Sequence, residues 1–157
     1  MGCRVIVPLT DKAVIMSVMS HPVIWDETSE DGVYLESWEP DLSEAWLGAY
    51  HDGVLIGLFN LHAITSVALK IHPMILPEYR GVLAYRAAQS ALRWVVDNTT
   101  FDKVNCEIPE IYPHVVRFAI HCGMVREGIN RRSFRKSGKI HHQINLGITR
   151  SEIEALP

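Results

Sequence analysis

The sequence predicts a fold of the α/β (α+β) class, in which a mixed, mostly antiparallel sheet is flanked by helices. Short apolar runs of alternating polarity are separated by tight turn signals, which is typical of antiparallel strands. A long amphipathic segment at 82–98 lies between two such runs, which predicts a parallel crossover. The length of 157 residues fits one core, so we expect a single domain over residues 1–157.

The N-terminal part is predicted to begin with a strand and a helix. Residues 3–8 are short and apolar, and Thr10 can cap a helix over 11–19 that has one apolar face. The pair His21-Pro22 ends this helix. Residues 22–44 are acidic and irregular, with room for one further short helix.

The middle of the chain predicts an antiparallel meander followed by the long helix. Three strands are expected, at 45–51, 54–64 and 66–74. Asp52-Gly53 is a strong hairpin signal between the first two. A loop at 77–81 leads into the helix at 82–98, in which Leu83, Ala87, Ala91 and Val95 form one apolar stripe.

The C-terminal part predicts a strand, a helix and a hairpin. Val104, Cys106 and Ile108 alternate within a strand at 103–109. A helix is expected at 113–122, where Gly123 is well placed to end it. Two strands at 129–135 and 139–148 flank the turn Ser137-Gly138.

The composition is that of an ordinary globular protein, with 48% apolar and 21% charged residues. No apolar run reaches the roughly 20 residues that a membrane helix needs, and the chain does not begin like a signal peptide. Three isolated cysteines favour a reducing compartment, so a cytoplasmic protein is expected. Neither cysteine nor histidine spacing, including the adjacent His141-His142, predicts a metal site.

The charge is unevenly distributed along the chain. Residues 1–70 hold three basic and ten acidic residues, whereas residues 71–157 hold twelve basic and eight acidic ones. One interpretation is ordinary solvated surface. The other is a bipolar molecule that binds a cation near its N-terminal half and an anion near its C-terminal half. The basic residues of the final hairpin lack interleaved aromatic side chains, so nucleic acid is not an expected partner.

The element order, together with Pro77-Glu78-Tyr79-Arg80-Gly81 between strand and helix, resembles the GCN5-related N-acetyltransferase (GNAT) superfamily. The segments that carry the match are IHPMILPEYRG, LAYRAAQSALRWVV and VVRFAIHCGMVREGI. The chain looks closest to the branch that acetylates ribosomal-protein N-termini and small amines. This resemblance implies a GNAT-like (acyl-CoA N-acyltransferase) fold with acetyl-CoA as cosubstrate and an amine as acceptor.

In such a fold, the loop at 77–81 would bind the diphosphate of acetyl-CoA. A helix N-terminus presents unpaired N–H groups to a diphosphate, and a glycine lets the backbone approach it closely. The resemblance implies that the diphosphate is bound by Arg80, Gly81, Val82, Leu83 and Ala84. It assigns the pantetheine arm to the splayed strand at Met74, Ile75 and Leu76.

Two residues depart from the family loop, which is Gln or Arg, two residues, Gly, one residue, then Gly or Ala. Counted onto Gly81, the first position is Glu78 and the last is Leu83. Glu78 would place an anion near the diphosphate, and Leu83 a side chain where backbone should approach. Both departures predict an impaired cradle.

Three residues are candidates for acid–base chemistry. Glu107 is the first candidate for the base, with an ordinary salt-bridged glutamate as the alternative. His72 has a pKa suited to proton transfer, although it could equally be structural before Pro73. Tyr112 precedes the later helix, close to where the family places residues that meet the sulfur of coenzyme A, and is the candidate acid for the thiolate.

Two functions from different classes follow. The first is an acetyl-CoA-dependent N-acetyltransferase whose cationic acceptor is attracted by the acidic residues of the segment 26–44. The second is a catalytically inactive GNAT-fold protein that acts through a protein partner. The stretch HPVIWDETSEDG and the altered loop resemble GNAT-like proteins of tailed bacteriophages, some of which are linked to head assembly.

Overall fold

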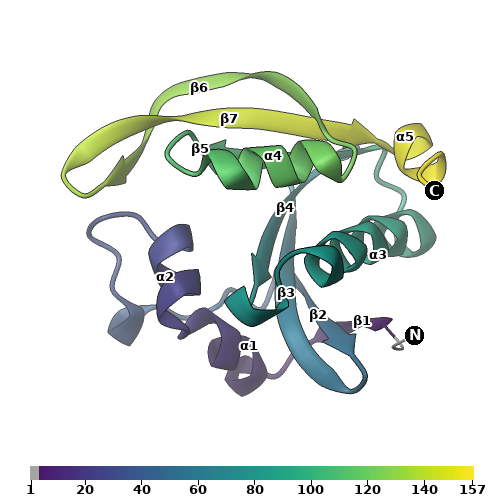
Figure 1. The fold of residues 1–157 in the computed structure, drawn as a ribbon, viewed down its shortest axis with the longest axis horizontal. Coiled ribbons are helices and arrows are strands. Elements are labelled where there is room, and N and C mark those ends of the chain that lie inside the picture. Colours follow the sequence, from purple (N-terminus) through teal and green to yellow (C-terminus); the bar gives the residue numbers. More distant parts are fainter. Residues whose placement is uncertain (1–3) are drawn as a thin grey trace.

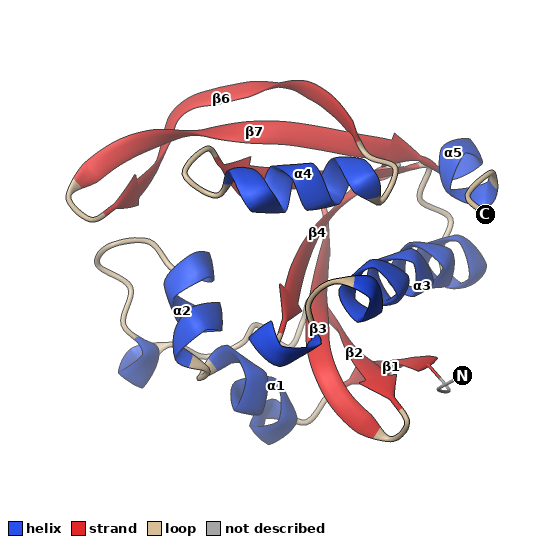
Figure 2. Ribbon diagram, in the orientation of Figure 1, coloured by secondary structure: helices blue, strands red, loops and turns tan. Residues whose placement is uncertain are grey.

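A computed structural model, which describes residues 4–157, contains a seven-stranded sheet in the order β1-β2-β3-β4-β5-β7-β6 (Figures 1 and 2). The strands are β1 (Arg4–Leu9), β2 (Ala45–His51), β3 (Val54–Ala63), β4 (Ala68–Ile75), β5 (Lys103–Pro109), β6 (Val125–Lys136) and β7 (Lys139–Thr149). The β4–β5 pair is parallel and the other five pairs are antiparallel. The predicted fold class, a mixed and mostly antiparallel sheet flanked by helices, is therefore confirmed.

The helices fall into two groups on the two faces of the sheet (Figure 1). They are α1 (Lys12–Met19), α2 (Pro22–Thr28), α3 (Val82–Asn98), α4 (Pro113–His121) and α5 (Arg150–Glu154), with 3-10 turns at Leu35–Ser37 and Pro77–Tyr79. The larger core packs α3, α4 and α5 against one face, and the smaller core packs α1 and α2 against the other. Adjacent residues of a strand point to opposite faces, so Ile75 belongs to the larger core and Met74 to the smaller.

The parallel pair β4–β5 opens into a gap. The two strands pair only over Ala68–Lys70 and Lys103–Asn105. Beyond these residues β4 continues beside β3 as far as Ile75, and β5 continues beside β7 as far as Pro109. The second halves of β4 and β5 therefore diverge, and the N-terminus of α3 follows directly at the open end of β4.

The sequence predictions agree closely with the structure at α3 and β5. The helix over 82–98 and the strand over 103–109 have the bounds expected. The first helix is capped by Asp11, whose carboxylate accepts from the Ala13 N–H at 2.9 Å, so the prediction of Thr10 as the cap is wrong. Residue 3 of the predicted first strand lies outside the described residues.

Three further features differ from the sequence expectations. The pair His21-Pro22 follows the end of α1 and also starts α2, because the His21 imidazole caps the helix and Pro22 occupies its first turn. Strand β6 begins at Val125, four residues earlier than expected. The short helix α5 was not predicted at all. No helix in the described part of the chain is long and apolar enough to span a membrane.

Candidate functional site

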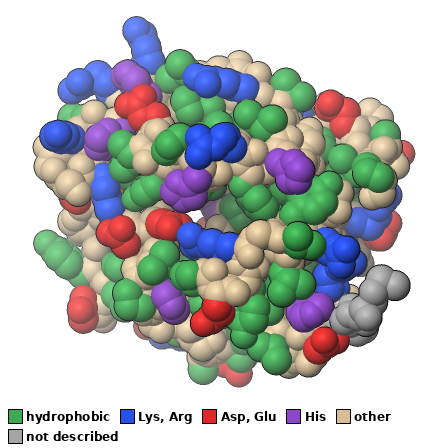
Figure 3. Space-filling view, viewed as in Figure 1, with side chains coloured by type: hydrophobic (Ala, Val, Ile, Leu, Met, Phe, Trp, Pro, Cys, Tyr) green, Lys and Arg blue, Asp and Glu red, His purple; other side chains and the backbone are tan. Residues whose placement is uncertain are grey.

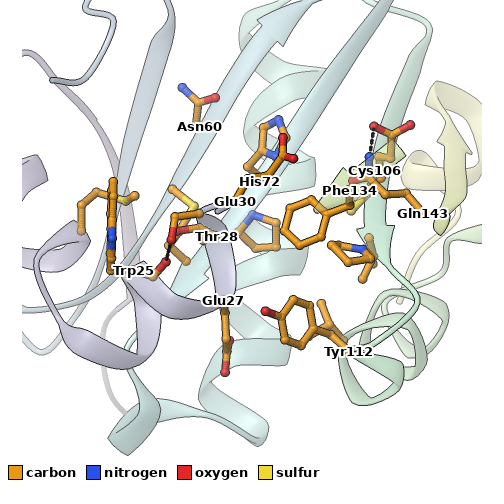
Figure 4. A pocket seen from close by; sticks show the side chains of 18 of the residues that line it. Trp25, Glu27, Thr28, Glu30, Asn60, His72, Cys106, Tyr112, Phe134 and Gln143 are labelled. Atoms are coloured by element: carbon orange, nitrogen blue, oxygen red, sulfur yellow. Dashed lines mark hydrogen bonds between the residues drawn. The ribbon is translucent and has the colours of Figure 1, made fainter. Parts of the chain in front are cut away.

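A cavity of about 430 Å³ lies on the α1/α2 side of the gap (Figure 4). Its walls come from α2 and the segment after it, from β3, β4 and β5, and from the β6–β7 hairpin. The predicted catalytic residues His72, Glu107 and Tyr112 all line it. The fold therefore brings together three side chains that lie on β4, on β5 and at the start of α4.

A second hollow, a groove of about 240 Å³, lies at the N-terminus of α3 on the α4 side of the gap. It is lined by Ile75, Arg80, Gly81 and Ala84, all of which were predicted to hold coenzyme A. Pro73 and Val115 line both the groove and the larger cavity. The two hollows therefore meet at the gap between the diverging strands.

The N-terminus of α3 offers an open backbone. Gly81 is its N-cap residue, with φ 98° and ψ −131°, and no side chain caps the first N–H groups. Among the described residues, no heavy atom beyond its chain neighbours lies within 4 Å of where a Gly81 Cβ would stand. Glycine is required here by backbone conformation, and the space beside it is free for a ligand.

The two departures from the family loop do not close this helix start. Leu83 packs against the larger core, so the expectation that its side chain lies where the backbone should approach a phosphate is not met. Glu78 is exposed in the 3-10 turn and does not line the groove. Val82 is also exposed and directs its side chain away from the core.

The anion beside the helix start is Glu27 of α2. Arg80 donates from its two terminal nitrogens to the two Glu27 carboxylate oxygens, at 3.1 and 3.0 Å. Its Nε donates to the carbonyl of Ile75 at 3.2 Å. Sequence reasoning did not find Glu27, because the contact joins residues 53 positions apart.

The backbone along the gap is set by the pairing of β4 with β3. The Leu76 N–H donates to the Ile56 carbonyl at 2.9 Å, so the backbone polar groups of Leu76 face β3. Because antiparallel pairs alternate, the polar groups of Ile71, Pro73 and Ile75 face the gap. Pro73 has no N–H, and the N–H of Ile71 is taken up by the last pair of β4 with β5, which leaves Ile75 as the donor on the open part of this edge.

The three predicted pantetheine residues are therefore not equivalent. Ile75 lines the groove and presents its backbone to the gap. Met74 lines the larger cavity instead, and Leu76 packs against the smaller core.

The Glu107 carboxylate is held by three side chains. Lys70 Nζ and Gln143 Nε2 donate to one oxygen at 3.5 and 3.2 Å, and Asn130 Nδ2 donates to the other at 3.0 Å. Glu107 is 19% exposed. The site thus contains a fixed carboxylate at the wall of the cavity, although its partners also suit a purely structural ion pair.

His72 is a neutral imidazole near neutral pH. Burial lowers the pKa of His72 to about 4, with smaller contributions from His62 and Lys70, and with Glu107 acting in the opposite direction. The His62 ring stacks on it at a centroid distance of 5.3 Å. His72 can therefore accept a hydrogen bond at one ring nitrogen while donating from the other.

Tyr112 occupies the N-cap position of α4, and its hydroxyl donates to the Asp26 carbonyl at 3.3 Å. Burial raises the pKa of Tyr112, and the charges of Asp26 and Glu27 act in the same direction. The phenol is therefore protonated at neutral pH, as a proton donor must be.

The acidic segment and the final hairpin meet at the cavity. Lys136 donates to the carbonyls of Asp26 and Ser29, and the Glu30 carboxylate accepts from the Arg135 N–H at 3.0 Å. Arg131, Arg132, Arg135 and Lys139 of this hairpin are exposed, whereas Lys136 is hydrogen-bonded to the end of α2 and the residue after it. The hairpin thereby covers one side of the cavity.

Aromatic side chains form another wall. Trp25, Trp38 and Trp46 line the cavity and contact one another edge-on, at centroid distances of 5.7 and 6.3 Å. Trp25 and Trp38 are half-buried and pack against the smaller core. Within residues 4–157, no cluster of three or more side chains suited to a metal was found.

The fold is that of the GNAT acyltransferases. The chain superimposes on the spermidine N-acetyltransferase from Vibrio cholerae in complex with CoA and spermine, with a TM-score of 0.80 and 18% identity over 96% of this chain and 98% of that one. The Vibrio cholerae spermidine/spermine N-acetyltransferase in complex with manganese ions gives a TM-score of 0.72, with 17% identity over 95% and 94% of the two chains. At these identities the likeness shows the fold alone.

Residues 10–156 match a family described as "Protein of unknown function (DUF2824)", and the chain belongs to this family. It is also similar to "Putative protein p31" of Acyrthosiphon pisum secondary endosymbiont phage 1. The two are 26% identical over 104 residues, which cover 66% of this chain. The match spans 65% of the phage protein's length.

Proposed function

We propose that this protein is an acetyl-CoA-dependent N-acetyltransferase that transfers an acetyl group to a cationic amine. The observation that carries the proposal is the meeting of groove and cavity at Pro73 and Val115. One hollow starts at an open helix N-terminus, which suits a diphosphate, and the other holds carboxylates and aromatic rings, which suit an amine. A thioester and an amine that entered from opposite sides would meet in the gap.

Acetyl-CoA binding is supported by the groove at the start of α3. The free N–H groups at Gly81, Val82 and Leu83 and the positive end of the helix dipole favour the diphosphate. The pantetheine arm would lie along Ile75, whose backbone faces the gap. The N–H of Ile75 is then available to polarise the thioester carbonyl.

A cationic acceptor is supported by the charges and rings of the cavity. Glu27, Glu30 and Glu107 line it, and the three tryptophans offer ring faces and edges along its wall. Since a structural neighbour of this chain was solved with spermine, a linear polyamine is the acceptor class that we propose. The acidic segment that was expected to attract a cation contributes Glu27 and Glu30.

The chemical step needs a proton to leave the amine and another to reach the sulfur. The amine nitrogen forms a bond to the thioester carbonyl carbon, and the carbon–sulfur bond then breaks. We propose that Glu107 accepts the amine proton, with His72 orienting the amine through a hydrogen bond. Tyr112, a protonated phenol at the same cavity, is the proposed donor to the thiolate. General acid–base catalysis by such groups typically accelerates a reaction by a factor of roughly 10² to 10⁴.

Calorimetric titration with acetyl-CoA tests the proposal. We expect micromolar binding by the native chain and its loss in Gly81→Glu, which places a carboxylate in the open cradle. Gly53→Glu is the matched control. Gly53 also has a positive φ and open space where a side chain would stand, but it lies in the β2–β3 turn. No heat from the native chain at millimolar acetyl-CoA would reject the proposal.

A second candidate is a catalytically inactive GNAT-fold protein that acts through protein contacts, for example in bacteriophage head assembly. The phage relative and the carboxylate already paired with Arg80 at the helix start favour it. It requires a protein partner and predicts no acetyl-CoA binding, so the same titration separates the two candidates. Under either candidate we propose that residues 1–157 form one domain, since one sheet runs through the described chain.

A further inference from the structure

The ion pair between Glu27 and Arg80 connects the two hollows of the site. Glu27 lines both the groove at the α3 N-terminus and the larger cavity, whereas Arg80 lines the groove only. The pair is bidentate, and the side chains are 23% and 36% exposed. An anion of this chain therefore already lies beside the place where a diphosphate would bind.

Glu27 differs from the other two carboxylates of the cavity in what holds it. Glu107 accepts from three side chains, and Glu30 accepts from the backbone of the β6–β7 hairpin. In the described part of the chain, the Glu27 carboxylate accepts hydrogen bonds from Arg80 alone. A diphosphate is an anion of higher charge that suits the same guanidinium, so it can take over this partner.

The backbone of Glu27 is fixed while its side chain is free to turn. Lys136 donates to the carbonyls of Asp26 and Ser29, on either side of it in the chain, and Tyr112 donates to Asp26 as well. Rotation about the side-chain bonds is therefore enough to move the carboxylate from the groove toward the cavity. Glu27 and Tyr112 both line the cavity, and in Figure 4 they lie at the lower edge of the side chains drawn.

We propose that Glu27 exchanges partners during binding: it pairs with Arg80 until the diphosphate of acetyl-CoA displaces it, and it then binds the ammonium group of the acceptor. This inference rests on the proposed function and deepens it. It makes Glu27 a specificity residue for cationic acceptors, and it makes the two substrates bind in order. Each substrate would strengthen the binding of the other, because coupling between sites is reciprocal.

The proposal has a measurable consequence for coenzyme A. Glu27→Gln keeps the shape of the side chain but removes the charge that competes with the diphosphate. Since partly exposed ion pairs contribute little, we expect binding of coenzyme A to tighten by roughly twofold to fivefold. Glu30→Gln is the matched control, because it removes a carboxylate from the same cavity without touching Arg80, and it should bind coenzyme A like the native chain.

The second consequence concerns the amine. With 1,4-diaminobutane as the probe, saturating coenzyme A should tighten amine binding by the native chain about fivefold, at the lower end of the usual range of such couplings. In Glu27→Gln the amine affinity should be weak and should not respond to coenzyme A. Circular dichroism spectra of the three proteins establish that the substitutions leave the fold intact.

The outcomes separate the inference from the proposed function. The exchange is overturned if the native chain and Glu27→Gln bind coenzyme A with equal affinity. It is also overturned if coenzyme A does not change the amine affinity of the native chain. Either result leaves the proposed acetyl transfer standing. Absence of coenzyme A binding in the native chain and in both variants rejects the proposed function itself.

Discussion

The carboxylate of Asp31 accepts a hydrogen bond of 2.8 Å from the backbone N–H of Gly138, which lies 107 positions later in the chain. Its other oxygen accepts from the Ser137 N–H at 3.0 Å. Ser137 and Gly138 both have positive φ, as a type I′ hairpin turn requires, so the turn directs two amides at one carboxylate. This clasp joins the segment after α2 to the tip of the β6–β7 hairpin, and the two lie near each other in Figure 1.

The clasp should weaken in acid. The amides of Gly138 and Ser137 hold the pKa of Asp31 below its ordinary value of 3.8. A lowered pKa in the folded state means that the carboxylate stabilises the protein above pH 3.8 and that this contribution is lost as the pH falls through the folded-state pKa. We therefore expect Asp31→Ala to lower the melting temperature near pH 7, with the difference from the native chain shrinking toward pH 3.

Glu36→Ala is the control for this experiment, because Glu36 is an exposed acidic residue of the same segment. Its melting temperature should follow that of the native chain at every pH. An Asp31→Ala difference that stays constant down to pH 3 would show that the lost contribution is not the ionised carboxylate.

His72 should titrate far below an ordinary histidine. Burial lowers its pKa from 6.5 to about 4, so the folded protein resists its protonation. Because the folded-state pKa is the lower one, the free energy of unfolding should fall as the pH drops from 6.5 toward 4. Histidine ring resonances followed by NMR between pH 8 and 3 should show one low midpoint that is absent in His72→Gln. A His72 midpoint near 6.5 contradicts the burial described here.

Gly81 should be required by its backbone conformation rather than by lack of space. Its φ of 98° with ψ −131° is a conformation that side chains disfavour, whereas the space around it is open. Gly81→Ala should therefore cost on the order of 1–3 kcal/mol in the free energy of unfolding, measured with urea. Gly128→Ala is the control, because Gly128 has open space without a positive φ and should change stability far less.

Tyr112→Phe should reduce acetyl transfer without unfolding the chain. The substitution removes the proposed proton donor and one hydrogen bond to the Asp26 carbonyl, and it keeps the ring packing. We expect kcat to fall by roughly 10² or more, with little change in the affinity for acetyl-CoA. A variant that loses affinity and keeps kcat would assign Tyr112 to binding instead.

Much of the fold was predictable because its signals are local. The apolar stripe between Leu83 and Val95, together with Gly81 before it, predicts α3. The alternation of apolar residues around Cys106 predicts β5. Local signals were also available for α5, where Thr149 and Glu152 form a capping box with the spacing that the motif requires. That helix has only five residues, too few for an apolar period to be visible.

The site was only partly predictable because its decisive contacts join distant segments. His72, Glu107 and Tyr112 were found from their positions near the gap. Glu27 was not, because no local pattern indicates that a carboxylate of α2 reaches Arg80. Leu83 shows the opposite case: counting along the loop placed its side chain at the cradle, but the turn of the helix directs it into the core.

The most direct test of the account is release of free thiol from acetyl-CoA in the presence of spermidine, with the acetylated amine identified by mass spectrometry. We expect thiol release and monoacetylated spermidine in equal amounts from the native chain, and a strong reduction of both in Tyr112→Phe. Thiol release that does not depend on the amine, or no acetylated product from a folded protein that binds acetyl-CoA, contradicts transfer across the gap between β4 and β5.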